Sequence, residues 1–172
     1  GLGDDEAAWD QIIDINLRAH IRAAKAVVPQ WLERGSGYFV AVASAAGLLT
    51  QLGAAPYSVT KHAAVGFAEW LAITHGDNGI GVSCVCPMGV DTPLLRAMSG
   101  STDAQARVAG AAVTGAGAVI SPNEVAGLVV RAIIDGTFLV LPHPEVLAMF
   151  GQKAADHDRW IAGMRRYQRS LR

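Results

Sequence analysis

Two short runs without a charged residue constrain the fold more than any other feature of this sequence. Tyr38–Val42 combines aromatic and β-branched residues, and Ile80–Cys86 is likewise uncharged, with β-branched residues, until Pro87 ends it. Such runs are typical of strands in a parallel sheet that helices cover on both faces. Because parallel strands cannot be joined by a tight turn, the segment between them has to cross over through a helix.

Helical patterns alternate with these runs along the chain. Ser121-Pro122-Asn123-Glu124 places a cap, a first-turn proline and a capping-box glutamate in the order that begins a helix. We expect a first helix over 5–34, kinked midway and stopped at Gly35, further helices over 57–75 and 121–135, a terminal helix beyond Pro144, and a third strand over 138–141. This alternation predicts a three-layer α/β fold with a parallel sheet, built as a single domain over 1–172.

The segment over about 92–120 breaks the alternation. It is rich in Gly, Ala, Ser and Thr and follows the second predicted strand. We interpret it as a flexible flap over a binding site.

Composition narrows the class of protein. Hydrophobic residues make up 51% of the chain, charged residues 17%, and the net charge is -1, which excludes a disordered or nucleic-acid-binding chain. No apolar run of about 20 residues occurs, and the start lacks the basic and apolar regions of a signal peptide, so we expect no membrane span and a cytoplasmic location. Cys84 and Cys86 are expected as buried, reduced thiols, and the scattered histidines predict no metal site.

The terminal helix carries an apolar stripe opposite several arginines. We interpret it as a helix docked on the domain with a solvated basic face. Binding to a membrane surface or to a partner remains the alternative.

Polar residues follow the predicted strands and begin the next helix. Ser44 comes directly after the first strand, at the carboxyl end where open α/β sheets bind ligands. Tyr57 and Lys61 are four positions apart, so they share one face of the helix that follows. Asn16 lies among apolar residues of the first helix, where an asparagine does not favour the helical conformation.

These segments resemble the short-chain dehydrogenases/reductases. The resemblance extends from about Trp9 to Leu141, with Ser44 preceding Tyr57 by 13 positions, the usual interval in that family. It is carried by Asp14-Ile15-Asn16-Leu17, Val42-Ala43-Ser44-Ala45-Ala46-Gly47, Tyr57-Ser58-Val59-Thr60-Lys61 and the segment from Cys86-Pro87 to Thr92-Pro93. The resemblance implies a Rossmann-type sheet reduced to its C-terminal strands and helices. It also implies an NAD- or NADP-dependent oxidoreductase that interconverts a secondary alcohol and a ketone by hydride transfer.

The resemblance implies four catalytic residues. Tyr57 would be the general acid/base, Ser44 would hold the substrate oxygen, Lys61 would also hold the nicotinamide ribose, and Asn16 would anchor a water on a proton path to Lys61. A phenol has a pKa of about 10, too high for proton exchange near neutrality. We therefore expect the neighbouring Lys61 ammonium to lower the pKa of Tyr57.

The resemblance also implies cofactor contacts, from Tyr57 and Lys61 and from Pro87, Gly89, Val90 and Thr92. Met88 departs from the family pattern, in which Gly follows Pro, and this puts the cofactor fit in doubt. The Gly-rich turn that cradles the pyrophosphate has no counterpart in this sequence and is expected upstream. Apolar residues suggest a substrate wall together with Ser44 and Ala45, namely Leu94, Leu95 and Met98.

Two hypotheses remain open. The first is an oxidoreductase whose partners are a small alcohol or ketone and further copies of itself, as a homodimer or homotetramer. The second is a non-catalytic remnant of such an enzyme that acts as an assembly or binding module. Members of the family that the chain resembles commonly dimerise through the helices that match 14–33 and 57–74. The strand at 38–42 is expected to have an unpaired edge that missing chain or another subunit covers.

Overall fold

Helices and strands alternate from the first helix onward, as the sequence predicts. The structure is a computed structural model and describes residues 2–171. Its elements are α1 (Glu6–Ile13), η1 (Asp14–Arg18), α2 (Ala19–Arg34), β1 (Gly37–Val42), α3 (Ala46–Leu49), α4 (Ala55–His75), η2 (Gly76–Asn78), β2 (Ile80–Val85), α5 (Pro93–Ser99), α6 (Ala104–Ala116), α7 (Pro122–Asp135), β3 (Leu139–Val140), α8 (Glu145–Ala155) and α9 (His157–Ser170).

The three strands form one parallel sheet in the order β1-β2-β3. β1 and β2 pair over their full length, from Gly37 opposite Ile80 to Val42 opposite Val85. β3 is shorter than the predicted 138–141 and pairs with the end of β2 through Leu139 and Val140. The parallel arrangement inferred from the uncharged runs is confirmed.

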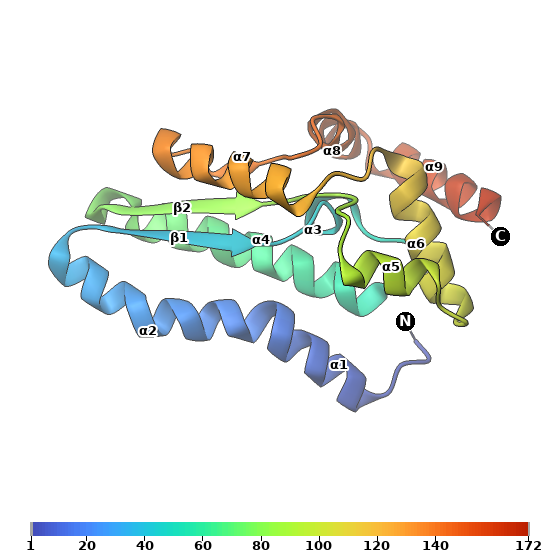
Figure 1. Cartoon of the computed structure of the whole chain (residues 1–172), viewed down its shortest axis with the longest axis horizontal. Coiled ribbons are helices and arrows are strands. Elements are labelled where there is room, and N and C mark those ends of the chain that lie inside the picture. Colours follow the sequence, from blue (N-terminus) through green and yellow to red (C-terminus); the bar gives the residue numbers. More distant parts are fainter. Residues whose placement is uncertain (1, 172) are drawn as a thin grey trace.

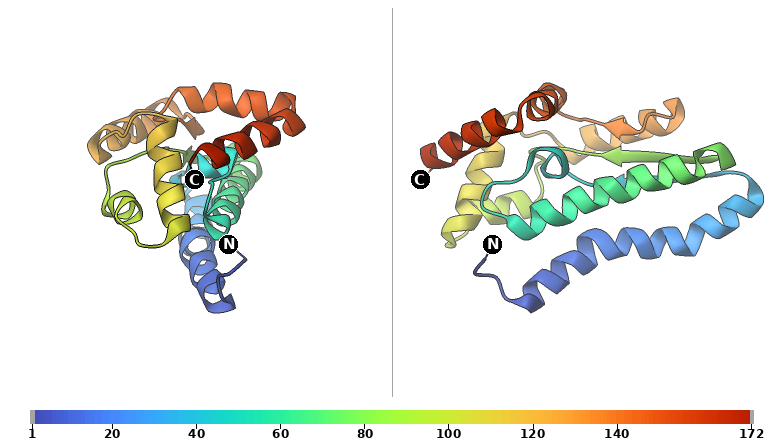
Figure 2. Two further views of the ribbon diagram at one scale, coloured as in Figure 1. Left: turned by 90° about the vertical axis from the view of Figure 1, so that its right-hand side faces the viewer. Right: turned by 180° about the vertical axis from the view of Figure 1, so that it is seen from behind.

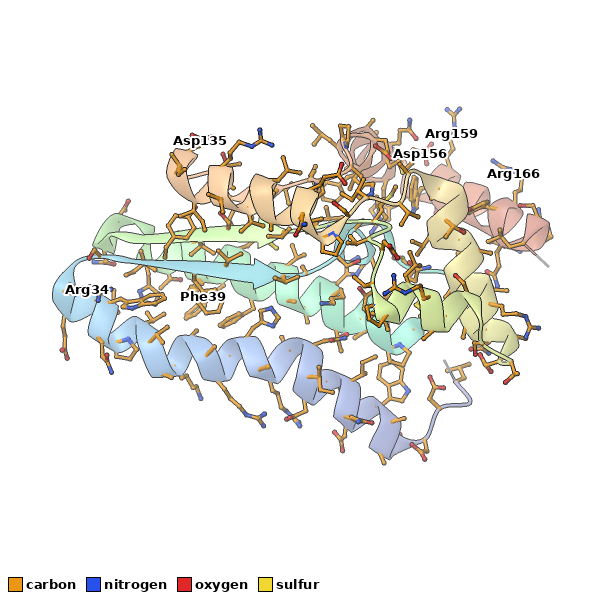
Figure 3. The ribbon with its side chains drawn as sticks, viewed as in Figure 1. Arg34, Phe39, Asp135, Asp156, Arg159 and Arg166 are labelled. Carbon is orange, nitrogen blue, oxygen red and sulfur yellow. The ribbon has the colours of Figure 1, made fainter. Side chains whose placement is uncertain are left out.

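Helices cover both faces of the sheet, which gives the predicted three layers (Figure 1). On one face, α2 and α4 pack against the strands and form the main core; Figure 3 shows Phe39 between β1 and α2. On the other face, α7 packs on the sheet around Ala132, Val85 and Val140. The views in Figure 2 show α5, α6 and α9 gathered at the end toward which the strands point. Ligand-binding residues are expected at this carboxyl end.

The predicted kink in the first helix is a π-helical turn. Between α1 and α2, residues Asp14–Arg18 form η1, so that a single long helix is interrupted without a break in the chain. π-turns inside α-helices are frequent at functional sites. Gly35, at φ 71°, ends α2 in the left-handed conformation that the sequence predicts for a helix stop.

Three segments differ from the sequence prediction. The predicted loop before α4 contains the short helix α3, and the terminal helix is divided at Asp156, which caps α9 and is labelled in Figure 3. The predicted flap contains α5 and α6, and a β-bridge between Val90 and Ile120 closes its base. Alanine favours helix strongly, so the Ala-rich segment forms helices where its content of small residues had suggested a loop.

Candidate functional site

Ser44 lies directly after β1, at the carboxyl end of the strand. Its side chain is buried, and its Oγ accepts a hydrogen bond from the Ala46 N–H at 3.1 Å and donates to the Pro87 carbonyl at 3.4 Å. Because Pro87 follows β2, this contact joins the ends of two neighbouring strands. Ser44 is therefore fixed at the edge of the sheet where α/β folds bind ligands.

Tyr57 and Lys61 lie one turn apart near the start of α4. The Lys61 side chain is buried, with Nζ 5.6 Å from the centre of the Tyr57 ring and donating to the Val42 carbonyl at 3.0 Å. The Ser44 side chain lies close enough to the Tyr57 phenol to lower its pKa. The structure thus brings Ser44, Tyr57 and Lys61 together at the end of β1.

Burial controls the proton affinity of this pair. It raises the pKa of Tyr57 above its ordinary value, and the nearby Ser44 side chain opposes this rise. It also lowers the pKa of Lys61. The expectation that Lys61 lowers the pKa of Tyr57 is therefore wrong for this structure. The cause is burial, which withdraws the phenol from water and disfavours its charged form.

Asn16 lies in the π-turn η1 and contacts α4. Its Nδ2 donates to Thr60 Oγ1 at 3.1 Å, and the Thr60 hydroxyl donates in turn to the carbonyl of Pro56 at 2.8 Å. The amide that looked out of place among apolar residues thus has a partner beside Lys61. This contact joins η1 to the helix that carries Tyr57, and a role in a proton path stays a prediction.

The segment from Pro87 to Thr92 is fixed by backbone hydrogen bonds. The Pro87 carbonyl accepts from the Ala45 N–H at 2.9 Å, and the Gly89 carbonyl accepts from the Ile120 N–H at 3.0 Å. Val90 pairs with Ile120 in the isolated bridge. Thr92 caps α5 by accepting a long hydrogen bond of 3.4 Å from the Leu95 N–H, which leaves its hydroxyl hydrogen available to another acceptor.

The Met88 side chain packs against the main core, and its effect on the cofactor fit stays a prediction. It is partly buried against that core, and a Cβ built on Gly117 would lie 2.6 Å from Met88 Cε. Gly117 therefore leaves room for this side chain. The departure from the family pattern is accommodated within the protein.

The predicted substrate wall divides into buried and exposed parts. Ala45 is buried, whereas Leu94, Leu95 and Met98 belong to the short helix α5, where Leu94 is 62% exposed. α5 packs beside α6 at the carboxyl end of the sheet (Figure 1). Contact of these side chains with a substrate stays a prediction.

Sequence reasoning missed His143. This residue is 2% exposed, and both of its ring nitrogens are hydrogen-bonded. The signal was its position after β3, at the carboxyl end of a strand, where open α/β sheets bind ligands.

Across residues 2–171, no helix combines the length and the apolar character needed to cross a membrane. In the same part of the chain, His, Cys, Asp and Glu side chains form no cluster of three or more that could hold a metal ion. Cys84 and Cys86 are buried free cysteines whose Sγ atoms lie 3.9 Å apart.

Comparison with known proteins places these residues in a family context. The family model of short chain dehydrogenases matches residues 3–102. Dehydrogenase/reductase SDR family member 4 of Oryctolagus cuniculus is 40% identical over 93 residues, which cover 54% of this chain and 36% of that protein. The 1-deoxy-11-beta-hydroxypentalenate dehydrogenase of Streptomyces exfoliatus is 30% identical over 136 residues, which cover 78% of this chain and 46% of that protein.

The fold is shared with solved structures. A short chain dehydrogenase/reductase from Burkholderia phymatum in complex with NAD has a TM-score of 0.77 at 24% identity, over 90% of this chain and 60% of that one. The matches therefore span less than two thirds of each of these proteins. The family model covers more than half of the chain, and the chain belongs to the short-chain dehydrogenase family.

Proposed function

We propose that this protein is an NAD(P)-dependent oxidoreductase that interconverts a secondary alcohol and a ketone. One observation carries the proposal: Ser44, which follows β1, meets Tyr57 and Lys61 of α4 at the carboxyl end of that strand. A buried phenol beside a buried ammonium is costly to maintain, and perturbed groups of this kind cluster at functional sites.

Tyr57 exchanges the proton in this proposal. Burial raises the pKa of the phenol, so the group carries its proton at neutral pH. The same rise opposes release of that proton, which would therefore pass to the strongly basic oxygen that develops as the ketone is reduced. Ser44, which lies beside the same phenol, would hold that oxygen from a second side. The apolar side chains of α5 favour a substrate with little charge, and the Streptomyces relative bears the name of a dehydrogenase for a hydroxylated compound.

The donors at the end of β1 and β2 fit a nicotinamide cofactor. The Lys61 ammonium has three N–H groups and one bond to Val42, which leaves donors for ribose hydroxyls. The Thr92 hydroxyl suits a carboxamide, with Pro87, Gly89 and Val90 supplying backbone groups alongside. When bound, the cofactor would supply or accept the hydride, while the protein orients the substrate and moves the proton.

Self-association is the proposed partner interaction. Large apolar side chains are exposed on η1 and α4, the helices that correspond to the dimer contact in the resemblance. They are Ile15, Val59, Trp70 and Ile73. We expect a dimer or tetramer in sedimentation equilibrium, and a strict monomer at micromolar concentration would contradict this part of the proposal.

The test compares two tyrosine variants. Tyr57→Phe should lower kcat for ketone reduction by about 10²–10⁴-fold, the usual contribution of a general acid, while NADH or NADPH binding measured by reduced-cofactor fluorescence persists. Tyr38→Phe, which removes a phenol hydroxyl bonded to Ser83 elsewhere in the sheet, should leave kcat unchanged. Full activity in Tyr57→Phe would refute the role of Tyr57. No saturable binding by the native chain would favour the non-catalytic assembly module.

A further inference from the structure

His143 is a buried histidine between β3 and α8 whose two ring nitrogens face different segments. Its Nδ1 accepts a hydrogen bond from the Met88 N–H at 3.1 Å. Its Nε2 lies 3.0 Å from the carbonyl of Ala118. A nitrogen that accepts from an amide carries no hydrogen, so the imidazole is the neutral tautomer with its hydrogen on Nε2, donated to Ala118.

These two bonds hold together segments that are distant in the sequence. Met88 follows β2, Ala118 follows α6, and His143 follows β3. Between the first two, Gly89 is buried, and a Cβ built on it would lie 3.3 Å from the Ala118 carbonyl oxygen. The imidazole therefore joins the backbones at Met88 and Ala118 where they approach so closely that a side chain at position 89 would be in tight contact.

The turn fixed by His143 is the one assigned to the cofactor. On the other side of the turn, the Pro87 carbonyl accepts from Ala45 and from Ser44 Oγ. On the side away from Ser44, the turn is tied to the rest of the domain through the Met88 amide and through the Gly89 carbonyl, which accepts from the Ile120 N–H. A change in the Met88 bond would shift the neighbouring Pro87 and Gly89 backbone groups.

We propose that His143 is a positioning residue that fixes the backbone of the Pro87–Val90 turn through Met88 and so sets the affinity for the nicotinamide cofactor. The part concerning affinity rests on the proposed function. The part concerning the turn stands on the two hydrogen bonds alone.

Two substitutions separate the two bonds of the imidazole. The Oδ1 of an asparagine occupies nearly the place of Nδ1, so His143→Asn can still accept from the Met88 N–H but cannot reach Ala118. The terminal amide of a glutamine reaches as far as Nε2, so His143→Gln can still donate to Ala118 but leaves the Met88 N–H without an acceptor. Each variant loses one buried hydrogen bond, which makes them matched controls.

The first measurement is amide hydrogen exchange of Met88 in the chain without cofactor. We expect native-like protection in His143→Asn and about tenfold or greater loss of protection in His143→Gln. The second measurement is cofactor affinity by fluorescence titration. We expect a Kd within about twofold of native in His143→Asn and about tenfold weaker in His143→Gln, which corresponds to about 1.4 kcal/mol.

The outcomes distinguish this proposal from the proposed function. Equal loss of Met88 protection in both variants, or protection in His143→Gln equal to native, overturns the positioning role. If the native chain binds neither NADH nor NADPH, the proposed function fails, while the exchange of Met88 still decides whether His143 fixes the turn. Nitrogen NMR of isotope-labelled histidine in the native chain provides a check that needs no variant. A hydrogen on Nδ1 of His143 would overturn the proposal even if both variants fail to fold.

Discussion

Replacement of Lys61 by methionine should stabilise the protein while abolishing catalysis. The Lys61 side chain is 9% exposed, and burial lowers the pKa of its ammonium. Removing an ion from water costs several kcal/mol even after the structure relaxes, and one charge-assisted hydrogen bond returns about 1.5–3 kcal/mol. Methionine keeps most of the volume without the charge. The Val42 carbonyl that loses its donor belongs to a residue that is 55% exposed, so we infer that water can replace the ammonium there.

We expect the free energy of unfolding to rise by about 1–2 kcal/mol at neutral pH. For a chain of this size, each kcal/mol shifts Tm by about 2–4 °C. The same substitution removes the ammonium proposed to hold the ribose, so cofactor binding and turnover should be lost. A residue that lowers the stability of the fold but is required for turnover indicates a catalytic site, where activity is kept at the expense of stability.

The pH dependence gives a second, independent readout. Because burial lowers the folded-state pKa of Lys61 below the unfolded value of 10.5, the unfolded chain binds more protons between these two pKa values. Stability of the native chain therefore rises with pH through that window. The advantage of Lys61→Met should be largest below the window and should disappear as pH approaches about 10.5. The raised pKa of Tyr57 affects stability only above about 10, and it does so in both proteins.

Urea unfolding followed by tryptophan fluorescence between pH 7 and pH 10 measures this difference. Lys25→Met removes the same charge from an exposed position on α2 and should change the free energy of unfolding by less than about 0.5 kcal/mol. The reasoning is refuted if Lys61→Met is less stable than native at pH 7. It is also refuted if the difference between the two proteins does not shrink as pH rises.

Two pairs of substitutions test the packing around the site by thermal unfolding. Gly47→Ala should cost about 1–3 kcal/mol, because its Cβ would lie 2.5 Å from the Lys61 carbonyl oxygen, whereas Gly66→Ala, with open space around it, should stabilise by about 0.5–1 kcal/mol. A lower Tm for Gly66→Ala, or an unchanged one for Gly47→Ala, contradicts this. Ser83→Ala should cost about 1–3 kcal/mol and more than Tyr38→Phe. Both hydroxyls donate to a backbone carbonyl, but Ser83 is fully buried and its bond to Thr137 is 2.7 Å, whereas Tyr38 is partly exposed and its bond to Ala132 is 3.1 Å. Equal Tm values for these two variants would contradict this ranking.

The sheet and its covering helices were predictable because they depend on local patterns. The uncharged runs at 38–42 and 80–86 mark β1 and β2 within one residue at each end. The capping box at Ser121 and Glu124 is present, with the Ser121 N–H donating to the Glu124 carboxylate at 2.7 Å. Periods, caps and helix stops are properties of a few neighbouring residues, so one sequence is enough to read them.

Contacts between distant segments were not predictable in the same way. The partner of Asn16 is Thr60, 44 positions away, and the partners of His143 are Met88 and Ala118. A single sequence contains no signal for such pairs. The four expected catalytic residues were identified from a resemblance, and their proximity is a property of the fold that joins the ends of β1 and β2.

The sign of the Tyr57 shift explains why spacing alone misled the electrostatic prediction. A separation of four positions on a helix brings an ammonium within reach of a phenol, and in water this would favour the phenolate. The fold adds an effect that spacing does not contain, because it withdraws both side chains from water. Withdrawal from water penalises both charged forms, so it opposes ionisation of the phenol and protonation of the amine together. The charge state of such a pair is therefore decided by the depth at which the fold buries it, and the i, i+4 pattern determines only which two groups share that environment.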